Sequence, residues 1–248
     1  WVVVAMNSYG GIDIFTSTLI LLLFVLYISL YMGCFTAVIF VMEKRMSVPI
    51  YLSAPIVWTL LEYLRGVALT GFPWSFLAHS QHNFLSFIQI ASVTGTYFIS
   101  FLIAAINCII FFLILKKPIS KIYLIAILFM VAASISYGII RLQEQQVAKL
   151  NAVIVQGNIR QDVKWDNAFK IKTIQVYYQN TIKNGSNVDL VVWPETALPL
   201  IFNEETYVNQ HIKTLPPMVN SHLLFGTLWK GQNGALSNST YLIGKNGD

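Results

Sequence analysis

The sequence predicts a bundle of membrane-spanning helices followed by an α/β domain, and three observations carry this prediction. Of 248 residues, 56% are hydrophobic and 11% are charged, whereas soluble globular proteins are about 45–50% apolar and about 25% charged. Residues 1–140 contain six Lys and Arg and three Asp and Glu, against ten and eight in residues 141–248. The second region also alternates between short apolar runs and helix-like segments, which is typical of an α/β layer.

The composition excludes several classes of protein. With only two cysteines, Cys34 and Cys108, the chain is not a disulfide scaffold. The net charge of +5 is spread without a basic run, and a nucleic-acid surface needs clustered Lys and Arg, so we expect no nucleic-acid partner. Because the chain begins at Trp1 rather than Met, inside apolar sequence, we expect a fragment of a longer protein.

Four stretches are long enough and apolar enough to cross a bilayer, whose hydrocarbon core takes about 20 residues of helix. The first covers about residues 14–42 and carries no charge. The second covers about 49–69 and carries two charged residues, Glu62 and Arg65. Buried helices of a large soluble protein are the alternative, but such helices usually keep a polar face. We therefore interpret both stretches as membrane spans.

The other two spans follow from a long uncharged segment and from the stretch after it. Residues 66–115 carry no charge, and glycine and proline residues interrupt a segment that is too long for one helix. We expect a loop, then a helix over about 84–115, and a fourth helix over about 121–140. Residues 1–140 are thus predicted to form a membrane region, and residues 150–248 a separate domain.

The loops between the spans predict the orientation of the chain in the membrane. Basic residues gather in the loops 43–48 and 116–121, whereas the loops 1–13 and 70–83 contain no Lys or Arg. Cytoplasmic loops carry an excess of Lys and Arg, so the two basic loops are predicted to be cytoplasmic. The domain after residue 141 would then lie on the opposite side, which in a bacterium is the periplasmic side of the inner membrane.

The outer loop Thr70-Gly71-Phe72-Pro73-Trp74-Ser75 is rich in turn-forming and aromatic residues. Two interpretations are open: an aromatic belt at the depth of the lipid headgroups, or a loop that shapes a groove through which lipids reach the site. His79 and His82 follow it closely and offer two metal ligands. A metal site needs further ligands, and the neighbouring sequence offers no third one, so we expect no metal.

Glu62 and Arg65 are three residues apart and would share one face of a helix. Ionisable groups in a membrane segment are costly and therefore suggest a function. A mutual ion pair near the outer interface explains them equally well. Cys34 and Cys108 fall within apolar spans, where a thiol is inert, so neither is a candidate nucleophile.

The second region reads as alternating strands and helices. Apolar runs indicate four strands, and helical spacing of apolar residues indicates two helices, the second closed by Pro216-Pro217. In chain order the expected elements are a strand over 152–156, a helix over 166–183, a strand over 188–193, a helix over 203–215, and strands over 223–228 and 239–243.

A candidate catalytic residue follows the strand at 188–193. In Val191-Val192-Trp193-Pro194-Glu195-Thr196, a carboxylate lies just past a fully apolar run. Ligands of open α/β sheets bind beyond the carboxyl ends of the strands, and a carboxylate partly shielded from water there can act as a general base. A Glu that caps the next turn is the equally weighted alternative.

These residues carry a resemblance to a known family. The segment Trp193-Pro194-Glu195-Thr196-Ala197 resembles the glutamate motif of the nitrilase superfamily. Together with Val155-Gln156-Gly157-Asn158-Ile159, Lys164-Trp165-Asp166 and Gly71-Phe72-Pro73-Trp74, it makes the chain similar to the apolipoprotein N-acyltransferase family. That resemblance implies about eight membrane helices with a periplasmic nitrilase-like αββα sandwich inserted before the last one. This chain would hold four of the spans and, over 150–248, the first half of that domain.

The resemblance implies acyl transfer in two steps. A cysteine thiolate takes an acyl chain from a phospholipid similar to phosphatidylethanolamine. The thioester then passes the chain to the N-terminal diacylglyceryl-cysteine of an apolipoprotein. Glu195 matches the Glu of a Glu-Lys-Cys triad, as the base that activates the thiol and later the amine. The Lys and Cys of the triad are not in this chain, so we expect the chain alone to be inactive.

The resemblance also suggests substrate contacts. Trp165 matches a Trp of the family's Lys-Trp-Asp motif that contacts substrate, although a plain packing role is the alternative. Trp74 and Pro73 of the outer loop are further candidates. The family implies a monomer in the bacterial inner membrane that needs no metal or other cofactor. Two other classes remain open: a membrane-tethered carbon–nitrogen hydrolase that uses water as the acceptor, and a non-catalytic membrane scaffold.

The orientation can be tested with single cysteines introduced at Ser47 and at Asn187. Ser47 lies in a loop predicted to be cytoplasmic, so its replacement should resist a membrane-impermeant thiol reagent in intact spheroplasts. A cysteine at Asn187 should react. The reverse pattern would overturn both the orientation and the periplasmic assignment.

Overall fold

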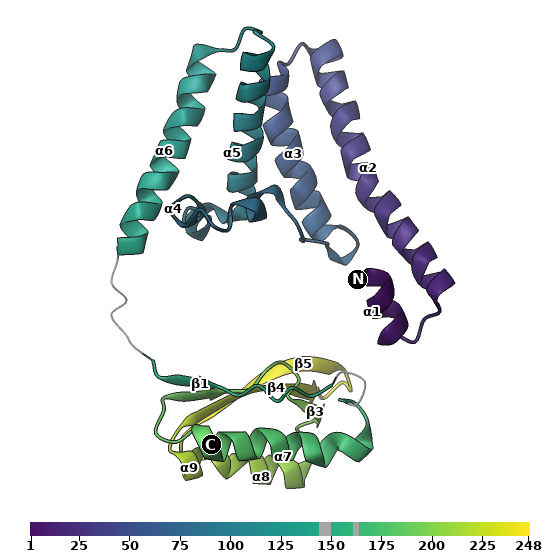
Figure 1. Cartoon of the computed structure of the whole chain (residues 1–248), viewed down its shortest axis with the longest axis vertical. Coiled ribbons are helices and arrows are strands. Elements are labelled where there is room, and N and C mark those ends of the chain that lie inside the picture. The colour runs from purple at the N-terminus through teal and green to yellow at the C-terminus, as the bar shows by residue number, and fades with distance from the viewer. Residues whose placement is uncertain (144–149, 161–163) are drawn as a thin grey trace. The chain divides into compact units, whose positions relative to one another are not determined.

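The computed structural model describes residues 1–143, 150–160 and 164–248 (Figure 1). The chain divides into two compact units, Trp1–Gln145 and Gln146–Asp248. Each unit has its own hydrophobic core, and each is described by itself below.

The first unit is helical. It contains α1 (Val2–Ser8), α2 (Ile14–Met46), α3 (Ile50–Val67), α4 (Leu85–Ile88), α5 (Ala91–Ile114) and α6 (Lys121–Gln143), with short 3₁₀ turns at Ala68–Thr70 and Leu77–Gln81. Four of these helices, α2, α3 with its following turn, α5 and α6, are long and apolar enough to cross a membrane. The predicted set of four membrane helices is therefore confirmed.

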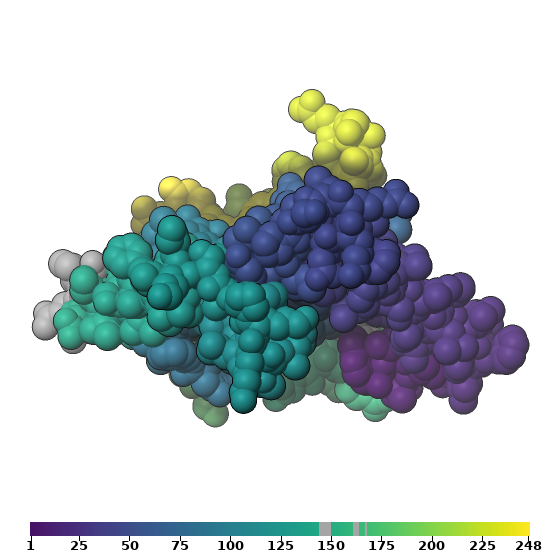
Figure 2. Space-filling view, turned by 90° about the horizontal axis from the view of Figure 1, so that it is seen from above, coloured from purple at the N-terminus to yellow at the C-terminus, as the bar shows by residue number. Residues whose placement is uncertain are grey.

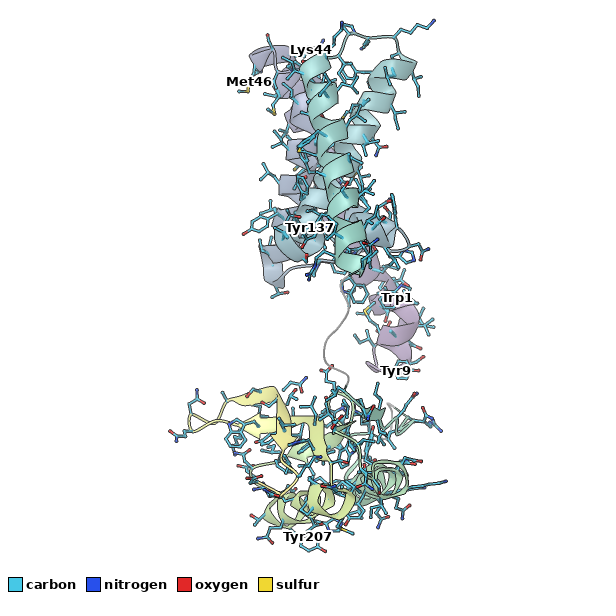
Figure 3. All side chains as sticks on the ribbon, turned by 90° about the vertical axis from the view of Figure 1, so that its left-hand side faces the viewer. Trp1, Tyr9, Lys44, Met46, Tyr137 and Tyr207 are labelled. Carbon is cyan, nitrogen blue, oxygen red and sulfur yellow. The ribbon has the colours of Figure 1, made fainter. Side chains whose placement is uncertain are left out.

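Both basic loops lie at one end of this unit. The α2–α3 and α5–α6 connections meet there, and residues from both, including Pro49 and Lys117, line one hollow. Figure 2 looks onto this end, where the blue and teal ends of the helices lie side by side. Figure 3 shows Lys44 and Met46 at this end and Trp1 near the opposite one. The arrangement matches the charge asymmetry on which the predicted orientation rests.

The expected single helix over 84–115 is wrong. The chain instead forms the short helix α4, a turn at 89–90 and then α5, within which Gly95 departs from helical geometry at φ 70°. A residue without a Cβ takes this left-handed conformation at little cost, so Gly95 marks the break. Helix α4 packs against α6 at Gly138, where a Cβ would lie 1.7 Å from the Ser86 carbonyl oxygen.

The second unit is a five-stranded sheet with three helices. Its strands are β1 (Ala152–Ile154), β2 (Leu190–Val192), β3 (Leu198–Ile201), β4 (His222–Lys230) and β5 (Leu236–Ile243), and its helices are α7 (Asn167–Asn184), α8 (Thr206–Lys213) and α9 (Leu215–Val219). Strand β1 pairs in parallel with β2, and both β2 and β3 pair in parallel with β4. Strand β5 pairs antiparallel with β4 over the whole length of β4's apolar run, so β2 and β3 share the other edge of β4.

The helices cover one face of this sheet (Figure 1). The buried side chains on that face include Val191, Leu223 and Phe225. The strand registers align Ile154, Val192, Leu224 and Leu242 in one row on the opposite face, where Ile154 is 79% and Leu242 61% exposed. One helical layer on a sheet whose second face is apolar and open is the arrangement of the first half of an αββα sandwich, which confirms the predicted fold class.

Two details of the second unit differ from the predictions. Strand β3 was not predicted, because its sequence Leu-Pro-Leu-Ile is short and contains a proline that argues against a strand. Pro216 and Pro217 were predicted to close a helix, but they occupy the first turn of α9. Proline is tolerated there because the first N–H groups of a helix have no partner within it.

The buried hydrogen bond from Trp193 Nε1 to Thr181 Oγ1, at 2.8 Å, provides a test of this core. Thr181→Val keeps the volume and leaves the indole N–H buried without an acceptor, which should cost about 1–3 kcal/mol of unfolding free energy. Thr173→Val on the same helix is the control, because the structure shows no hydrogen bond from the Thr173 hydroxyl to a described residue. Thermal unfolding in detergent measures both, and equal losses would contradict the structural role of this bond.

Candidate active site at a break in the sheet

The predicted catalytic segment forms a break between β2 and β3. Trp193 still donates its N–H to the Leu224 carbonyl of β4 at 2.8 Å, but the next four residues, 194–197, are not part of a strand. The Pro194 carbonyl accepts hydrogen bonds from Ala197 N at 3.2 Å and Gly226 N at 3.3 Å. Thr196 adopts φ 50°, which is uncommon for a residue with a Cβ. The main chain therefore turns sharply at Glu195 and then rejoins β4 as β3.

Gly226 of β4 makes this turn possible. A Cβ on Gly226 would lie 2.6 Å from the Thr196 nitrogen and 2.8 Å from the Glu195 Cα, both of them backbone atoms. A glycine in a strand often marks a place where another backbone approaches closely. Here the approaching backbone is the one that carries the candidate base, so Gly226 sets the position of Glu195.

Trp193 anchors the turn on its buried side. The side chain is 2% exposed, and its indole N–H is satisfied by Thr181 of α7. The indole stacks on Tyr177 at 5.3 Å and lies 5.7 Å from the Phe225 ring. Burial raises the pKa of Tyr177, which keeps that phenol neutral in the core. The residue before Pro194-Glu195 is thus held by packing and by a hydrogen bond.

The carboxylate of Glu195 points away from this core. Glu195 is exposed, which differs from the partial shielding that we predicted, because the face of the sheet on which it lies is open. Its Oε1 accepts a hydrogen bond from Asn238 Nδ2 of β5. No backbone N–H of a described residue donates to this carboxylate, so the structure does not support the alternative of a capping Glu. A carboxylate oriented by one amide and open to approach is suited to accept a proton.

The two other predicted motifs of this unit, residues 155–159 and 164–166, lie at the same edge of the sheet as Glu195. Val155, just after β1, donates its N–H to the Val192 carbonyl at 2.8 Å, so the segment after β1 begins beside the end of β2. Lys164 reaches the Glu195 carbonyl oxygen with its Nζ at 3.4 Å. Trp165 follows Lys164 directly and is 52% exposed, which excludes a packing role in the described core. The carboxyl ends of parallel strands meet at one edge, which explains this convergence.

Gly157 and Asn158 shape the segment after β1. A Cβ on Gly157 would lie 2.6 Å from the Tyr177 ring, so only glycine fits beside that phenol without rearrangement. Asn158 adopts φ 49°, and its Oδ1 accepts a hydrogen bond from Gln156 Nε2 at 2.7 Å. The motif Gln156-Gly157-Asn158 thus continues irregularly from β1 at the edge that carries Glu195.

The remaining predicted site residues, Pro73 and Trp74, belong to the first unit. Trp74 is 56% exposed, stacks on Trp1 at 6.0 Å and lies tilted against Phe72 at 5.7 Å. The outer loop therefore presents an aromatic cluster, as either interpretation of its sequence requires. Within the described residues, no group of three His, Cys, Asp or Glu side chains could hold a metal ion.

Sequence reasoning missed three residues of this site. Asn238 had no motif to mark it, and its pairing with Glu195 follows from the register of β4 with β5. Gly226 lies in an apolar strand, where an isolated glycine is a signal of close backbone approach. Lys164 belongs to the motif Lys164-Trp165-Asp166, but nothing in the sequence indicates a role for its ammonium.

The fold and the site define a class of protein, and comparison with known sequences then shows which proteins this chain resembles. The class is a membrane protein with a nitrilase-like domain. Residues 1–109 match the family described as apolipoprotein N-acyltransferase N-terminal domain. The apolipoprotein N-acyltransferase of Geobacter metallireducens is 32% identical over 262 residues, which cover 100% of this chain and 50% of that protein. Those of Haemophilus ducreyi and Coxiella burnetii are 27% and 28% identical, covering 98% and 91% of this chain and 48% and 47% of each relative.

The chain is thus similar over its whole length to apolipoprotein N-acyltransferases. It spans about half the length of the curated relatives that it matches and corresponds to their N-terminal half. It is a multi-pass membrane protein, as the four membrane-capable helices and these relatives together indicate.

The close approach at Gly226 can be tested by adding a single methyl group. Gly226→Ala forces the Glu195 turn away from β4 and should cost about 1–3 kcal/mol of unfolding free energy, as overpacking does. Gly231→Ala is the matched control, because its Cβ would meet the Asn233 side-chain oxygen at 3.0 Å and the Ala235 carbonyl oxygen at an ordinary 3.6 Å. Unfolding curves in detergent compare the two. A Gly226→Ala variant as stable as the control would show that the turn does not depend on this contact.

Proposed function

We propose that the complete protein containing this chain transfers an acyl chain from a phospholipid to the N-terminal diacylglyceryl-cysteine of apolipoproteins. The observation that carries the proposal is the Glu195 carboxylate, held by a strand break and oriented by Asn238, in a chain whose relatives are named apolipoprotein N-acyltransferases. The Lys and Cys of the triad are expected from the part of the protein outside this chain.

In this proposal Glu195 is the general base of both half-reactions. It first takes the proton of the cysteine thiol, and the sulfur attacks the ester carbonyl of the phospholipid. The ester C–O bond breaks, and the leaving lysophospholipid oxygen takes the proton back from Glu195. In the second half the acceptor amine attacks the thioester and loses its proton to Glu195, which returns it to the departing thiolate. One carboxylate, oriented by Asn238 and accessible to substrate, serves both steps.

Neighbouring groups would assist this cycle without reacting. Asn238 donates to Oε1 and fixes the direction of the carboxylate, while the Lys164 ammonium lies at the Glu195 main-chain carbonyl. The exposed indole of Trp165 is our candidate for contact with substrate, as are Trp74 and Pro73 of the outer loop. We propose that the donor resembles phosphatidylethanolamine and that the protein acts as a monomer.

A membrane setting suits this chemistry. Both substrates carry acyl chains, and each methylene moved from the bilayer into water costs about 0.8 kcal/mol. Chemistry performed at the bilayer surface avoids extracting a whole chain, and proximity then supplies part of the rate. We infer that the protein lies in the bacterial inner membrane with its catalytic domain periplasmic, which the basic loops at one end of the helical unit support.

The proposal is tested by Glu195→Gln in the complete protein. The change keeps the shape and removes the proton acceptor, so acyl-enzyme formation from labelled phospholipid should slow by about 10²–10⁴-fold. The melting temperature in detergent should change little, because Glu195 is exposed and buries no apolar surface.

Glu204→Gln is the control for this experiment. Glu204 is also exposed and forms a surface ion pair with Lys230 at 2.7 Å, so its loss should leave acylation unchanged. Near-normal acylation by Glu195→Gln would remove Glu195 from the mechanism. Release of free fatty acid in place of acyl transfer by the wild-type protein would instead favour a hydrolase.

A further inference from the structure

Two exposed amide side chains, Gln156 and Asn158, follow β1 at the edge of the sheet that carries Glu195. Gln156 Nε2 donates a hydrogen bond to Asn158 Oδ1 at 2.7 Å. The two remaining polar groups of this amide pair, Gln156 Oε1 and Asn158 Nδ2, have no hydrogen-bond partner among the described residues. A primary amide offers both an acceptor and a donor, so the pair keeps one of each for a molecule from outside the chain.

Gln156 lies next to the turn that carries Glu195. The β1–β2 register places Ile154 opposite Val192, and the Val155 N–H continues this pairing by donating to the Val192 carbonyl at 2.8 Å. Two positions after Ile154, Gln156 therefore comes level with the residue that precedes Glu195. Neighbouring strands lie about 4.8 Å apart, so the amide pair begins about one strand spacing from the Glu195 turn.

The amide pair and the carboxylate also share one face of the sheet. Successive side chains of a strand alternate between its two faces. Val155 is 4% exposed and belongs to the core, so Ile154 before it and Gln156 after it face the open side. The Glu195 carboxylate lies on this side as well, because its partner Asn238 is placed there by the β4–β5 register. The apolar row that includes Ile154 thus ends in polar groups beside the base.

A shared packing partner sets the position of the amide pair relative to the base. A Cβ on Gly157 would lie 2.6 Å from the Tyr177 ring, so the main chain between the two amides lies directly against this phenol. The same ring stacks on Trp193, two residues before Glu195, at 5.3 Å. Asn158 holds φ 49°, a left-handed conformation that asparagine adopts more readily than most residues. The amides and the base are therefore held over one aromatic support.

We propose that Gln156 and Asn158 bind the main chain of the acceptor polypeptide in the second half-reaction. Gln156 Oε1 accepts the N–H of the residue that follows the acceptor cysteine, and Asn158 Nδ2 donates to the carbonyl of that same residue. In an extended chain these two groups point to one side, and a neighbouring antiparallel strand satisfies them with one acceptor and one donor. The amide pair supplies this combination from side chains. This inference rests on the proposed function, because it names the groups that position its acceptor.

The place of the pair beside the base favours the acceptor over the acyl donor. The acceptor amine must come within hydrogen-bond reach of Glu195, at about 3 Å, when it loses its proton. The N–H of the following residue belongs to the next nitrogen along the same chain, and Gln156 lies about one strand spacing away. The ester group of a phospholipid has no N–H to donate to Gln156 Oε1. Because the contacts are to the main chain, the side chain of the bound residue is left unread.

The two half-reactions of the complete protein separate this role from a structural one. Gln156→Met keeps the length of the side chain and removes its hydrogen-bonding groups. Acyl-enzyme formation from labelled phospholipid should keep the wild-type rate, because no acceptor takes part in it. Transfer from the acyl-enzyme to a diacylglyceryl-cysteinyl peptide should be about three- to tenfold slower, which corresponds to the loss of one neutral hydrogen bond. Gln179→Met, at an exposed position of α7, is the matched control and should behave as wild type in both steps.

An acceptor analogue tests the named contact itself. An ester replaces the first peptide bond of the acceptor, which removes the N–H of the second residue and keeps the shape of the chain. The wild-type protein should transfer the acyl chain to this ester about three- to tenfold more slowly than to the peptide. Gln156→Met should use both acceptors equally, because it has no oxygen with which the N–H could interact.

Asn158→Gly keeps the test decisive if Gln156→Met folds poorly. Glycine adopts a positive φ without steric cost, so the change removes the donor and retains the backbone, and it should slow only the second half-reaction. Equal slowing of both half-reactions, or a wild-type protein that uses the peptide and the ester equally, would overturn this inference and leave the proposed function standing. A wild-type protein that forms no acyl-enzyme would instead contradict the proposed function, and the acceptor role with it.

Discussion

The architecture of the candidate site depends on one close contact between main chains. Strand β4 carries β2 and β3 on the same edge, and between them the chain turns at Glu195 against Gly226. The two Pro194 carbonyl hydrogen bonds close this turn, and Trp193 is held beneath it in the core. A side chain at the contact would push the turn off the sheet. The position of the carboxylate is thus set by backbone geometry, whereas its direction is set by Asn238.

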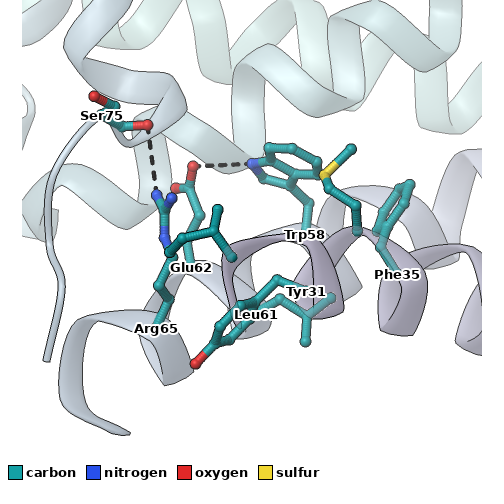
Figure 4. A pocket seen from close by; sticks show the side chains of 9 residues that line it. Tyr31, Phe35, Trp58, Leu61, Glu62, Arg65 and Ser75 are labelled. Atoms are coloured by element: carbon teal, nitrogen blue, oxygen red, sulfur yellow. Dashed lines mark hydrogen bonds between the residues drawn. The ribbon is translucent and has the colours of Figure 1, made fainter. Parts of the chain in front are cut away.

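In the helical unit, two charged side chains are held inside a bundle of otherwise apolar helices. Glu62 uses one carboxylate oxygen to bind the outer loop to α3 and leaves the other unmatched. Arg65 lies beside the same cavity, and its guanidinium donates a hydrogen bond to the main-chain carbonyl of Ser75 in the outer loop. Ionisable residues in membrane segments cost free energy to bury, and they often mark functional sites. Here Glu62 and Arg65 line the same cavity without forming an ion pair with each other, so the mutual ion pair considered from the sequence is wrong (Figure 4).

Much of this organisation could be predicted from the sequence, for identifiable reasons. Long uncharged stretches leave few alternatives to membrane helices, and the glutamate segment stands at the end of an apolar strand with its motif intact. The rest depended on tertiary contacts that no local pattern encodes. Strand β3 exists because β4 offers it an edge, despite Pro199. Asn238 reaches Glu195 only through the β4–β5 register, and the exposure of Glu195 follows from the open face of the sheet.

In the mechanism that we propose, the break in the sheet presents Glu195 to the reacting sulfur. A structure of the complete protein in a lipid nanodisc measures this most directly, through the distance from the Glu195 carboxylate to the sulfur of the thioester-forming cysteine. We expect the two groups to lie within hydrogen-bond reach, directly at roughly 3 Å or through one bridging water, with Asn238 still donating to the carboxylate. A Glu195 carboxylate turned away from that sulfur, with the contact at Gly226 intact, would contradict it.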